Sequence, residues 1–238
     1  MSRAERNVEA APAAGPVAAG ASGARSPRRR LVPIASEGWP FILVPLVVAL
    51  SLAWLGWVKV GLLPFLVAAF MAYFFRDPER TAPAMAGAVL APADGRVVSV
   101  ERNVTDPFVG PAIQVSIFLS PLDVHVNRAA IGGQVVSVEH RPGEFVPAYK
   151  PEASARNEQT SLAVEGERGR VVMRQVAGVL ARRIVCRVRP GEMLQAGERF
   201  GMIKFGSRMD VLMPAAARVT ARVGDRVRAG ESVLGVFP

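Results

Sequence analysis

Two hydrophobic patterns divide this chain of 238 residues. Residues 39–75 are almost continuously apolar, and Lys59 is their only charged residue. After residue 76, short runs rich in Val and Ile alternate with Gly and Pro. A long apolar block is typical of membrane or deeply buried helices, whereas short β-branched runs between turn residues are typical of strands. The pattern therefore predicts a helical segment followed by a β domain.

The apolar block is too long for one membrane helix, which needs about 20 residues. Lys59 lies near its middle, between Gly56 and Gly61, where a turn is expected. We therefore predict two apolar helices, over about 41–56 and 61–75. This hairpin would either dip into the membrane or span it twice. A buried helical pair in a soluble core is the alternative.

Arginines on both sides of the block place both of its ends at the cytoplasmic face of the cell membrane. They are Arg28, Arg29, Arg30, Arg76 and Arg80. Residues 1–36 are rich in Ala, Gly, Pro and Arg, and we expect them to form a disordered basic tail. The apolar stretch begins too late and is too long for a cleaved signal peptide. The predicted organisation is a tail (1–36), a membrane hairpin (37–75) and a β domain (76–238).

The β domain carries an internal repeat. Gly191–Gly201 and Gly224–Gly235 each contain a Gly-acid pair, then Ala-Gly-Glu, then a closing Gly. Two tight corners between strands would need these glycines. The arrangement resembles the repeated hairpins of biotinyl/lipoyl-type barrel-sandwich hybrids. We predict a mainly β (α+β) fold, with a barrel-sandwich-hybrid-like β domain behind the helical hairpin.

The amino-acid composition limits the kinds of molecule that this chain is expected to bind. The formal net charge is +9, from 29 Lys and Arg against 20 Asp and Glu, which suits a partner that carries phosphates. The apolar block favours lipid over nucleic acid as that partner. Cys186 is the only cysteine and the chain has two histidines, so neither a disulfide framework nor a metal site is expected.

Two polar residues stand out among the predicted strands. Asp94 lies in a Pro-Ala-Asp-Gly turn, and His125 alternates with Val124 and Val126. On local evidence each has an ordinary interpretation: Asp94 caps its own turn, and His125 is a satisfied structural residue. His140 lacks polar neighbours and is interpreted as structural.

Gly206 and Ser207 lie between two apolar runs and permit an unusual reaction. A serine hydroxyl can attack the carbonyl immediately before it, and glycine allows the strained backbone that this requires. The resulting ester can break by β-elimination, which leaves a new C-terminus on Gly206. The remaining dehydroalanine hydrolyses to a pyruvoyl group. The reaction needs a base, usually a histidine oriented by an aspartate.

Five ordered segments give the chain a family resemblance. They are YFFRDPER (73–80), PADG (92–95), DVHVNR (123–128), ARNEQT (155–160) and FGSR (205–208). Over about residues 36–238 the chain resembles the phosphatidylserine decarboxylase proenzymes, most closely their short bacterial form. One difference is Phe-Gly-Ser-Arg where the longer forms have Leu-Gly-Ser-Thr. The sequence therefore does not identify the residue that polarises the scissile carbonyl.

The resemblance implies that Ser207 becomes a covalent pyruvoyl cofactor, with no metal. Cleavage at Gly206–Ser207 would give a β chain (1–206) and an α chain (207–238) that remain together as a heterodimer. Asp94 and His125 would complete a self-cleaving triad with Ser207. The pyruvoyl ketone would form a Schiff base with the amine of phosphatidylserine, and loss of CO₂ would yield phosphatidylethanolamine. His125 is also the candidate that returns a proton to the substrate.

The substrate phosphate requires a cation, and Arg128 and Lys150 are the candidates. The alternative for each is that it is an ordinary solvated charge on the protein surface.

The main competing function is a membrane-anchored barrel-sandwich adaptor without catalysis, which would need a long heptad hairpin between the two halves. A pyruvoyl decarboxylase for a soluble amino acid is a second rival, but it would not need the apolar hairpin. A homo-oligomer is left open.

Overall fold

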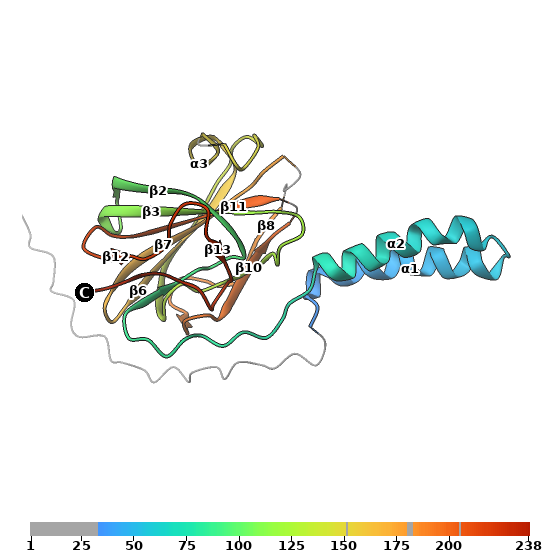
Figure 1. Cartoon of the computed structure of the whole chain (residues 1–238), viewed down its shortest axis with the longest axis horizontal. Coiled ribbons are helices and arrows are strands. Elements are labelled where there is room, and N and C mark those ends of the chain that lie inside the picture. Colours follow the sequence, from blue (N-terminus) through green and yellow to red (C-terminus); the bar gives the residue numbers. More distant parts are fainter. Residues whose placement is uncertain (1–32, 151, 180–182, 205) are drawn as a thin grey trace, which may run out of the picture.

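The computed structural model describes residues 33–150, 152–179, 183–204 and 206–238. Most of the expected basic tail, with Arg28 to Arg30, lies outside the described residues, as does Phe205 beside the Gly-Ser pair. In the described part, a helical hairpin projects from one side of a β body (Figure 1).

The hairpin consists of α1 (Trp39–Trp54) and α2 (Val58–Phe74), preceded by the short 3-10 helix η1 (Ser36–Gly38). A four-residue helix, α3 (Ala153–Arg156), lies on the β body. The strands, in chain order, are β1 (Ala88–Leu90), β2 (Gly95–Asp106), β3 (Gly110–Leu119), β4 (Val126–Arg128), β5 (Gly133–Arg141), β6 (Gln159–Gly166), β7 (Gly169–Val176), β8 (Ile184–Cys186), β9 (Met193–Leu194), β10 (Arg199–Ile203), β11 (Ser207–Pro214), β12 (Arg218–Val219), β13 (Arg226–Val227) and β14 (Val233–Val236).

Most of these strands belong to one curled antiparallel sheet in the order β13-β2-β3-β11-β7-β6-β5-β9. Two three-stranded sheets, β1-β14-β12 and β4-β10-β8, pack with it around a common apolar core. Val and Ile fill this core because their branched side chains suit a pleated, half-buried surface. The prediction of a mainly β fold with an apolar helix pair before it is confirmed.

The helical hairpin turns earlier than predicted. Residues 55–57 form the turn, where Gly56 has a φ of +81°, and Lys59 lies inside the first turn of α2. The expectation that Gly61 flanks the turn is wrong. A Cβ at Gly61 would lie 2.9 Å from the carbonyl oxygen of Ala49, so this glycine lets α1 and α2 approach closely instead.

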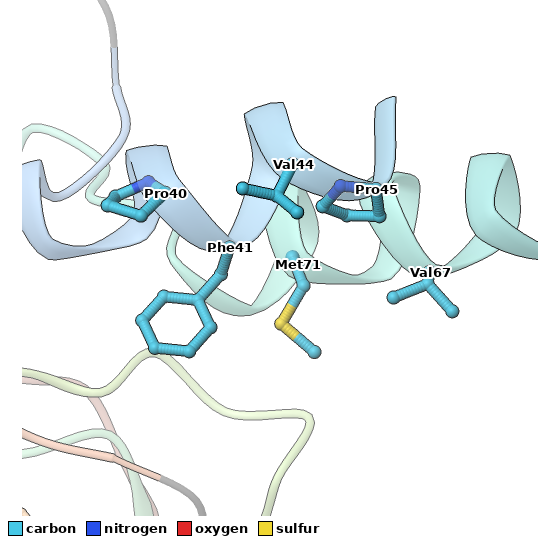
Figure 2. A pocket seen from close by; sticks show the side chains of 6 residues that line it. All are labelled: Pro40, Phe41, Val44, Pro45, Val67 and Met71. Carbon is cyan, nitrogen blue, oxygen red and sulfur yellow. The ribbon is translucent and has the colours of Figure 1, made fainter. Parts of the chain in front are cut away.

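Apolar side chains cover the outside of the hairpin. Leu50 and Leu63 are 61% and 70% exposed, and an apolar hollow of about 420 Å³ lies on the helices (Figure 2). Pro45 and Met71 are among its lining residues. Residues Ser36–Trp54 are long and apolar enough to cross a membrane, whereas Val58–Phe74 is a shorter apolar helix. An exposed apolar surface of this size is unfavourable in water, so it indicates membrane association.

The base of the hairpin is anchored in the β body. Phe74 and Phe75 are fully buried and pack in a small cluster with Val124, Val126 and Met202. The backbone N–H of Ala35 donates to the Phe75 carbonyl oxygen at 2.8 Å. The last turn of α2 is therefore a fixed part of the β body.

The internal repeat forms two equivalent corners. In each copy a short strand follows the first glycine: β9 pairs with Gly133 at the start of β5, and β13 pairs with Gly95 at the start of β2. Left-handed glycines occupy matching positions, with φ of +90° and +79° at Gly191 and Gly197 and of +97° and +73° at Gly224 and Gly230. Since β13 and β9 are the two ends of the large sheet, the repeat relates the sheet's two halves.

Candidate active site

Ser207 lies at the start of β11, between β3 and β7. Its side chain is fully buried, and its Oγ has no hydrogen-bond partner among the described residues. Gly206 has a φ of +65°, a left-handed conformation that glycine adopts without a steric penalty. Burying a hydroxyl without a partner costs about 1–3 kcal/mol. A buried hydroxyl that no described residue satisfies suggests a functional use.

His125 reaches the same peptide segment from the loop before β4. Its Nε2 lies 3.5 Å from the backbone nitrogen of Gly206, which donates to it. Its Nδ1 lies 2.9 Å from the carbonyl oxygen of Asp123. A carbonyl oxygen only accepts hydrogen bonds, so Nδ1 carries the proton and the lone pair of Nε2 faces Gly206. This tautomer is the one that can act as a base at the Gly206–Ser207 bond.

The surroundings of His125 keep its imidazole neutral. The side chain is fully buried, and its ring centroid lies 4.2 Å from that of Phe74. Burial lowers the pKa of His125 to about 4, although the carbonyl and carboxylate of Asp123 act in the opposite direction. At neutral pH the residue is therefore an unprotonated base.

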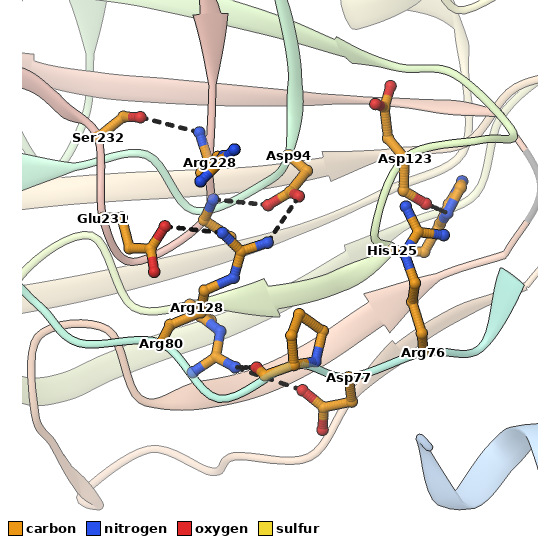
Figure 3. A network of polar contacts seen from close by, with 12 residues as sticks. Arg76, Asp77, Arg80, Asp94, Asp123, His125, Arg128, Arg228, Glu231 and Ser232 are labelled. Carbon is orange, nitrogen blue, oxygen red and sulfur yellow. Dashed lines mark hydrogen bonds and ion pairs between the residues drawn. The ribbon is translucent and has the colours of Figure 1, made fainter. Parts of the chain in front are cut away.

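Asp94 occupies the turn between β1 and β2. Its Oδ1 accepts the Ala229 N–H at 2.7 Å, and its Oδ2 pairs with Arg80 at 3.0 Å (Figure 3). Burial raises the pKa of Asp94, and the nearby Asp123 acts in the same direction, while the Ala229 N–H and Arg80 lower it.

The internal repeat shows that this corner forms without a carboxylate. Gly132 precedes Gly133 as Asp94 precedes Gly95, and Ala196 corresponds to Ala229. Asp94 accepts the backbone N–H of Ala229, and the backbone nitrogen of Ala196 has the same place in the other copy. A Cβ at Gly132 would lie 3.4 Å from this Ala196 nitrogen. Asp94 is therefore not explained by turn formation alone.

Within the described chain, no hydrogen bond joins Asp94 to His125. The bonds of His125 go to Asp123 and Gly206, and those of Asp94 go to Ala229 and Arg80. The structure thus brings His125 to the Gly-Ser bond and holds Asp94 in the neighbouring ionic network (Figure 3). The backbone carbonyl of Asp123 is the group that orients the imidazole.

Gly178 is a site residue that sequence reasoning missed. A Cβ on Gly178 would lie 2.4 Å from the carbonyl oxygen of Gly206, so only glycine leaves space for that oxygen. Asn157, fully buried, holds this region: its Nδ2 donates to the carbonyls of Val146 and Ala177, each at 2.8 Å. Asn157 belongs to the Ala-Arg-Asn-Glu-Gln-Thr segment, so a signal for it was present in the sequence.

A buried amide pair lies on the same side of the sheet as Ser207. Gln175 faces Met209 across the β7–β11 pair, and Ser207 lies two residues before Met209, so the two side chains share one face. Gln175 Nε2 donates to Asn127 Oδ1 at 2.8 Å. Asn127 Nδ2 and Gln175 Oε1 have no partner among the described residues. In the sequence, the feature that could have indicated this amide pair is the polar Gln175 within the apolar run of β7.

Arg208 points to the opposite face of β11. Its guanidinium is buried and bonds to Asp210 at 2.6 Å and to Ser116 at 2.7 Å. Neighbouring strand residues point to opposite faces, so Arg208 is directed away from Ser207. Arg208 thus stabilises the face of the sheet opposite Ser207 through its bonds to Asp210 and Ser116.

The two cations suggested for substrate binding lie in different surroundings. Arg128 is almost fully buried, and its guanidinium donates to Asp77 and to the carbonyls of Pro78 and Gly197. Lys150 is half-exposed and lies 3.8 Å from Glu152. These contacts favour a structural role for Arg128 and a surface ion pair for Lys150. Among the described residues, no three His, Cys, Asp or Glu side chains lie close enough together to hold a metal ion.

Comparison with known proteins connects these features to one family. The family model for phosphatidylserine decarboxylase matches residues 67–235. A phosphatidylserine decarboxylase proenzyme of Nitrosomonas europaea is 47% identical over 208 residues, which cover 86% of this chain and 95% of that protein. Proteins of the same name from Beijerinckia indica and Geotalea uraniireducens are 44% and 39% identical, and the matches cover 90% and 100% of their lengths. With Ser207, His125 and Asp94 inside the matched region, the chain belongs to the phosphatidylserine decarboxylase family.

Proposed function

We propose that this chain is a proenzyme that cleaves itself between Gly206 and Ser207 and then decarboxylates phosphatidylserine to phosphatidylethanolamine. The observation that carries the proposal is the buried, unpartnered Ser207 hydroxyl next to a peptide segment that also contacts the basic nitrogen of His125. The names of the relatives support both the substrate and the existence of a precursor.

Self-cleavage starts at the Ser207 hydroxyl. His125 Nε2 takes its proton, and Oγ attacks the Gly206 carbonyl carbon. The C–N bond then breaks as the nitrogen is protonated, which leaves an ester between Gly206 and the Ser207 oxygen. Removal of the Ser207 α-proton expels the Gly206 carboxylate and produces dehydroalanine. Water then replaces the nitrogen, ammonia leaves, and residue 207 becomes pyruvoyl.

The described residues fit these steps. The Nδ1 hydrogen bond to Asp123 holds His125 in the tautomer that can accept a proton at Nε2. Gly178 leaves space around the Gly206 oxygen, which gains negative charge when its carbon is attacked. Asp94, with its raised pKa and its partner Arg80, is proposed to tune the charge around this site.

The pyruvoyl group, once formed, supplies an electron sink for the electrons left behind when CO₂ departs. The residues of the chain then have to hold the substrate amine near residue 207 and return one proton to its α-carbon. His125 is the proposed proton carrier: its neutral Nε2, which faces the Gly206–Ser207 segment, would take a proton from the substrate ammonium and then pass it to the α-carbon. A residue-125 variant that carries preformed pyruvoyl and still decarboxylates normally would exclude this second role.

We further propose that the enzyme works at the cytoplasmic face of the cell membrane, with the α and β chains held together and no metal. The exposed apolar hairpin supports a membrane location and disfavours a soluble amino acid as substrate. The adaptor alternative requires a long helical hairpin between the two halves. Between β5 and β8 the described residues hold one helix, the four-residue α3.

Substitution of the reacting residues tests the proposal. Ser207→Ala should remain one chain without decarboxylase activity. His125→Ala should slow cleavage by about 10²–10⁴-fold, the usual contribution of a general base. His140→Ala is the matched control, because His140 is half-exposed on β5 and does not contact the Gly-Ser segment. Cleavage of His125→Ala at the normal rate would contradict the assigned base, and activity of Ser207→Ala would contradict the function.

A further inference from the structure

A cationic cleft lies where the hairpin joins the β body. It encloses about 600 Å³, and its lining residues are Tyr73, Arg76, Asp94, Ser120, Leu122, Asp123, Arg226, Val227 and Arg228. Tyr73 lies in the last turn of α2 and Arg76 lies just after that helix, whereas Arg226 to Arg228 come from β13 and the turn that follows it. In Figure 3, Arg228 is drawn beside Asp94, and Arg76 is drawn beside Asp123 and His125.

Two arginines of this cleft lack an acidic partner within the described chain. Asp123 pairs with Arg226 at 3.2 Å, and Asp94 pairs with Arg80 at 3.0 Å, while Arg80 also pairs with Glu231 at 2.7 Å. For Arg76 and Arg228, the part of the chain that the structure describes provides no carboxylate within ion-pair distance. The cleft therefore carries an excess of positive charge.

Arg76 is held in a fixed position. Its guanidinium donates to the carbonyl oxygens of Tyr73 at 2.9 Å and Leu122 at 2.7 Å, and it lies over the Tyr73 ring, 3.9 Å from the centroid. Carbonyl oxygens orient a guanidinium without cancelling its charge. A pre-positioned arginine loses little side-chain freedom when it binds an anion.

The cleft is next to the reacting groups. Ser120 follows Leu119, whose Cα pairs with Ser207, and the backbone carbonyl of Asp123 bonds to His125. In phosphatidylserine, only one carbon and the ester oxygen separate the amine-bearing carbon from the phosphorus. Because the head group is this short, its phosphate site has to lie near residue 207, and Ser120 and Asp123 connect this cleft to that part of the structure.

We infer that Arg76 and Arg228 bind the phosphodiester of a membrane lipid head group. This inference rests on the proposed function and gives the phosphate role to a pair other than Arg128 and Lys150. Arginine suits phosphate because its planar donors match the phosphate oxygens. The position at the hairpin base favours a lipid over a free phosphate, since the exposed apolar helices beside it would lie in the bilayer.

Binding can be tested without turnover in the full-length Ser207→Ala chain in detergent. The probes are dihexanoylphosphatidylserine, dihexanoylphosphatidylethanolamine and inorganic phosphate, measured by calorimetric titration. Arg228→Gln and Arg76→Gln should each weaken binding of both lipids about tenfold or more, as expected for loss of a charge-assisted hydrogen bond. Arg218→Gln, an exposed arginine on β12 outside the cleft, should leave binding unchanged.

Two results would overturn the inference: lipid binding that is unchanged in both cleft variants, or inorganic phosphate that binds as tightly as the lipids. Arg76→Lys checks that a loss in Arg76→Gln is not a folding defect, and it should retain part of the affinity. If the chain neither cleaves nor decarboxylates but binding still depends on Arg76 and Arg228, the proposed function fails while the phosphate site stands.

Discussion

At the residue scale, the protonation of His125 determines when the precursor can cleave itself. The residue must be neutral to accept the Ser207 proton, and burial lowers its pKa to about 4. We therefore predict that the cleavage rate is constant from pH 8 down to about pH 5 and falls about tenfold per unit below pH 4. The rate can be followed on denaturing gels after cell-free synthesis of the precursor.

The same pKa affects stability. In the unfolded chain His125 would titrate near its ordinary pKa of 6.5, above the value in the folded protein. Protonation therefore favours unfolding, and stability should decrease as the pH falls from 6.5 towards 4.

The predicted pH dependence of cleavage would be contradicted by a cleavage profile with its midpoint near pH 6.5. Such a profile would show that the imidazole of His125 is accessible to water.

Gly178 gives a second prediction at this scale. In Gly178→Ala the new methyl group would meet the Gly206 oxygen at 2.4 Å, and one of the two backbones must move. Misplacing a reacting group by about 1 Å costs on the order of 10²-fold in rate, so cleavage should slow by at least tenfold. Gly132→Ala is the control, because Gly132 is exposed and its Cβ would make ordinary contacts. Normal cleavage in folded Gly178→Ala would show that the carbonyl does not need this space.

The sequence indicated some of the site residues and could not indicate others. Local chemistry indicates Ser207, because a serine after a glycine can attack the preceding carbonyl. Asp94 and His125 have ordinary interpretations on local evidence, and only the family resemblance assigns them to the site. Gly178 and Gln175 carry no such chemistry of their own. Their importance depends on which strands are neighbours, and strand pairing over long separations is not encoded in a local pattern.

At the element scale, the hairpin tip indicates how far the helices extend into the membrane. α1 has 16 residues, or about 24 Å at 1.5 Å per residue, against a hydrocarbon thickness of about 30 Å. Trp54 and Trp57 at the tip are 87% and 62% exposed, and Lys59 follows them. Trp favours membrane interfaces, whereas a charge at the bilayer centre costs about 2.5–3.5 kcal/mol. We predict that the tip reaches the opposite interface.

Cysteine labelling tests this topology. In a Cys186→Ser background, Leu55→Cys should react with a membrane-impermeant maleimide added to the side opposite the β body. Thr220→Cys, exposed on the β body, is the control and should react only from the other side. Failure of Leu55→Cys to react from the opposite side would indicate a hairpin that only dips into the bilayer.

The elements themselves were largely predictable, because β-branched runs and a continuous apolar block are strong local signals. The turn of the hairpin was misplaced because Gly61 has a packing role that depends on the neighbouring helix. The turn that carries Asp94 was expected from its Pro-Ala-Asp-Gly sequence, and it separates β1 from β2. For Gly61, a tertiary contact decided what the glycine does.

At the scale of the whole molecule, the proposed α chain is part of the core. It would contribute β11, which pairs with both β3 and β7, and it includes the fully buried residues Met209, Val211 and Leu234. Each such side chain contributes about 1.5–3 kcal/mol by burial. We therefore predict that the 32-residue fragment 207–238 stays bound after cleavage and is released only by denaturation.

The central claim is that the active protein is made by cleavage at Gly206–Ser207, and an intact-mass spectrum of the purified, active protein tests it most directly. Under denaturing conditions we predict two chains, 1–206 and 207–238, with the smaller one lighter by one ammonia than a peptide that begins with serine. Under native conditions the two should appear as one complex, and Ser207→Ala should appear as one uncleaved chain. A single intact chain of 238 residues with full decarboxylase activity would contradict the claim.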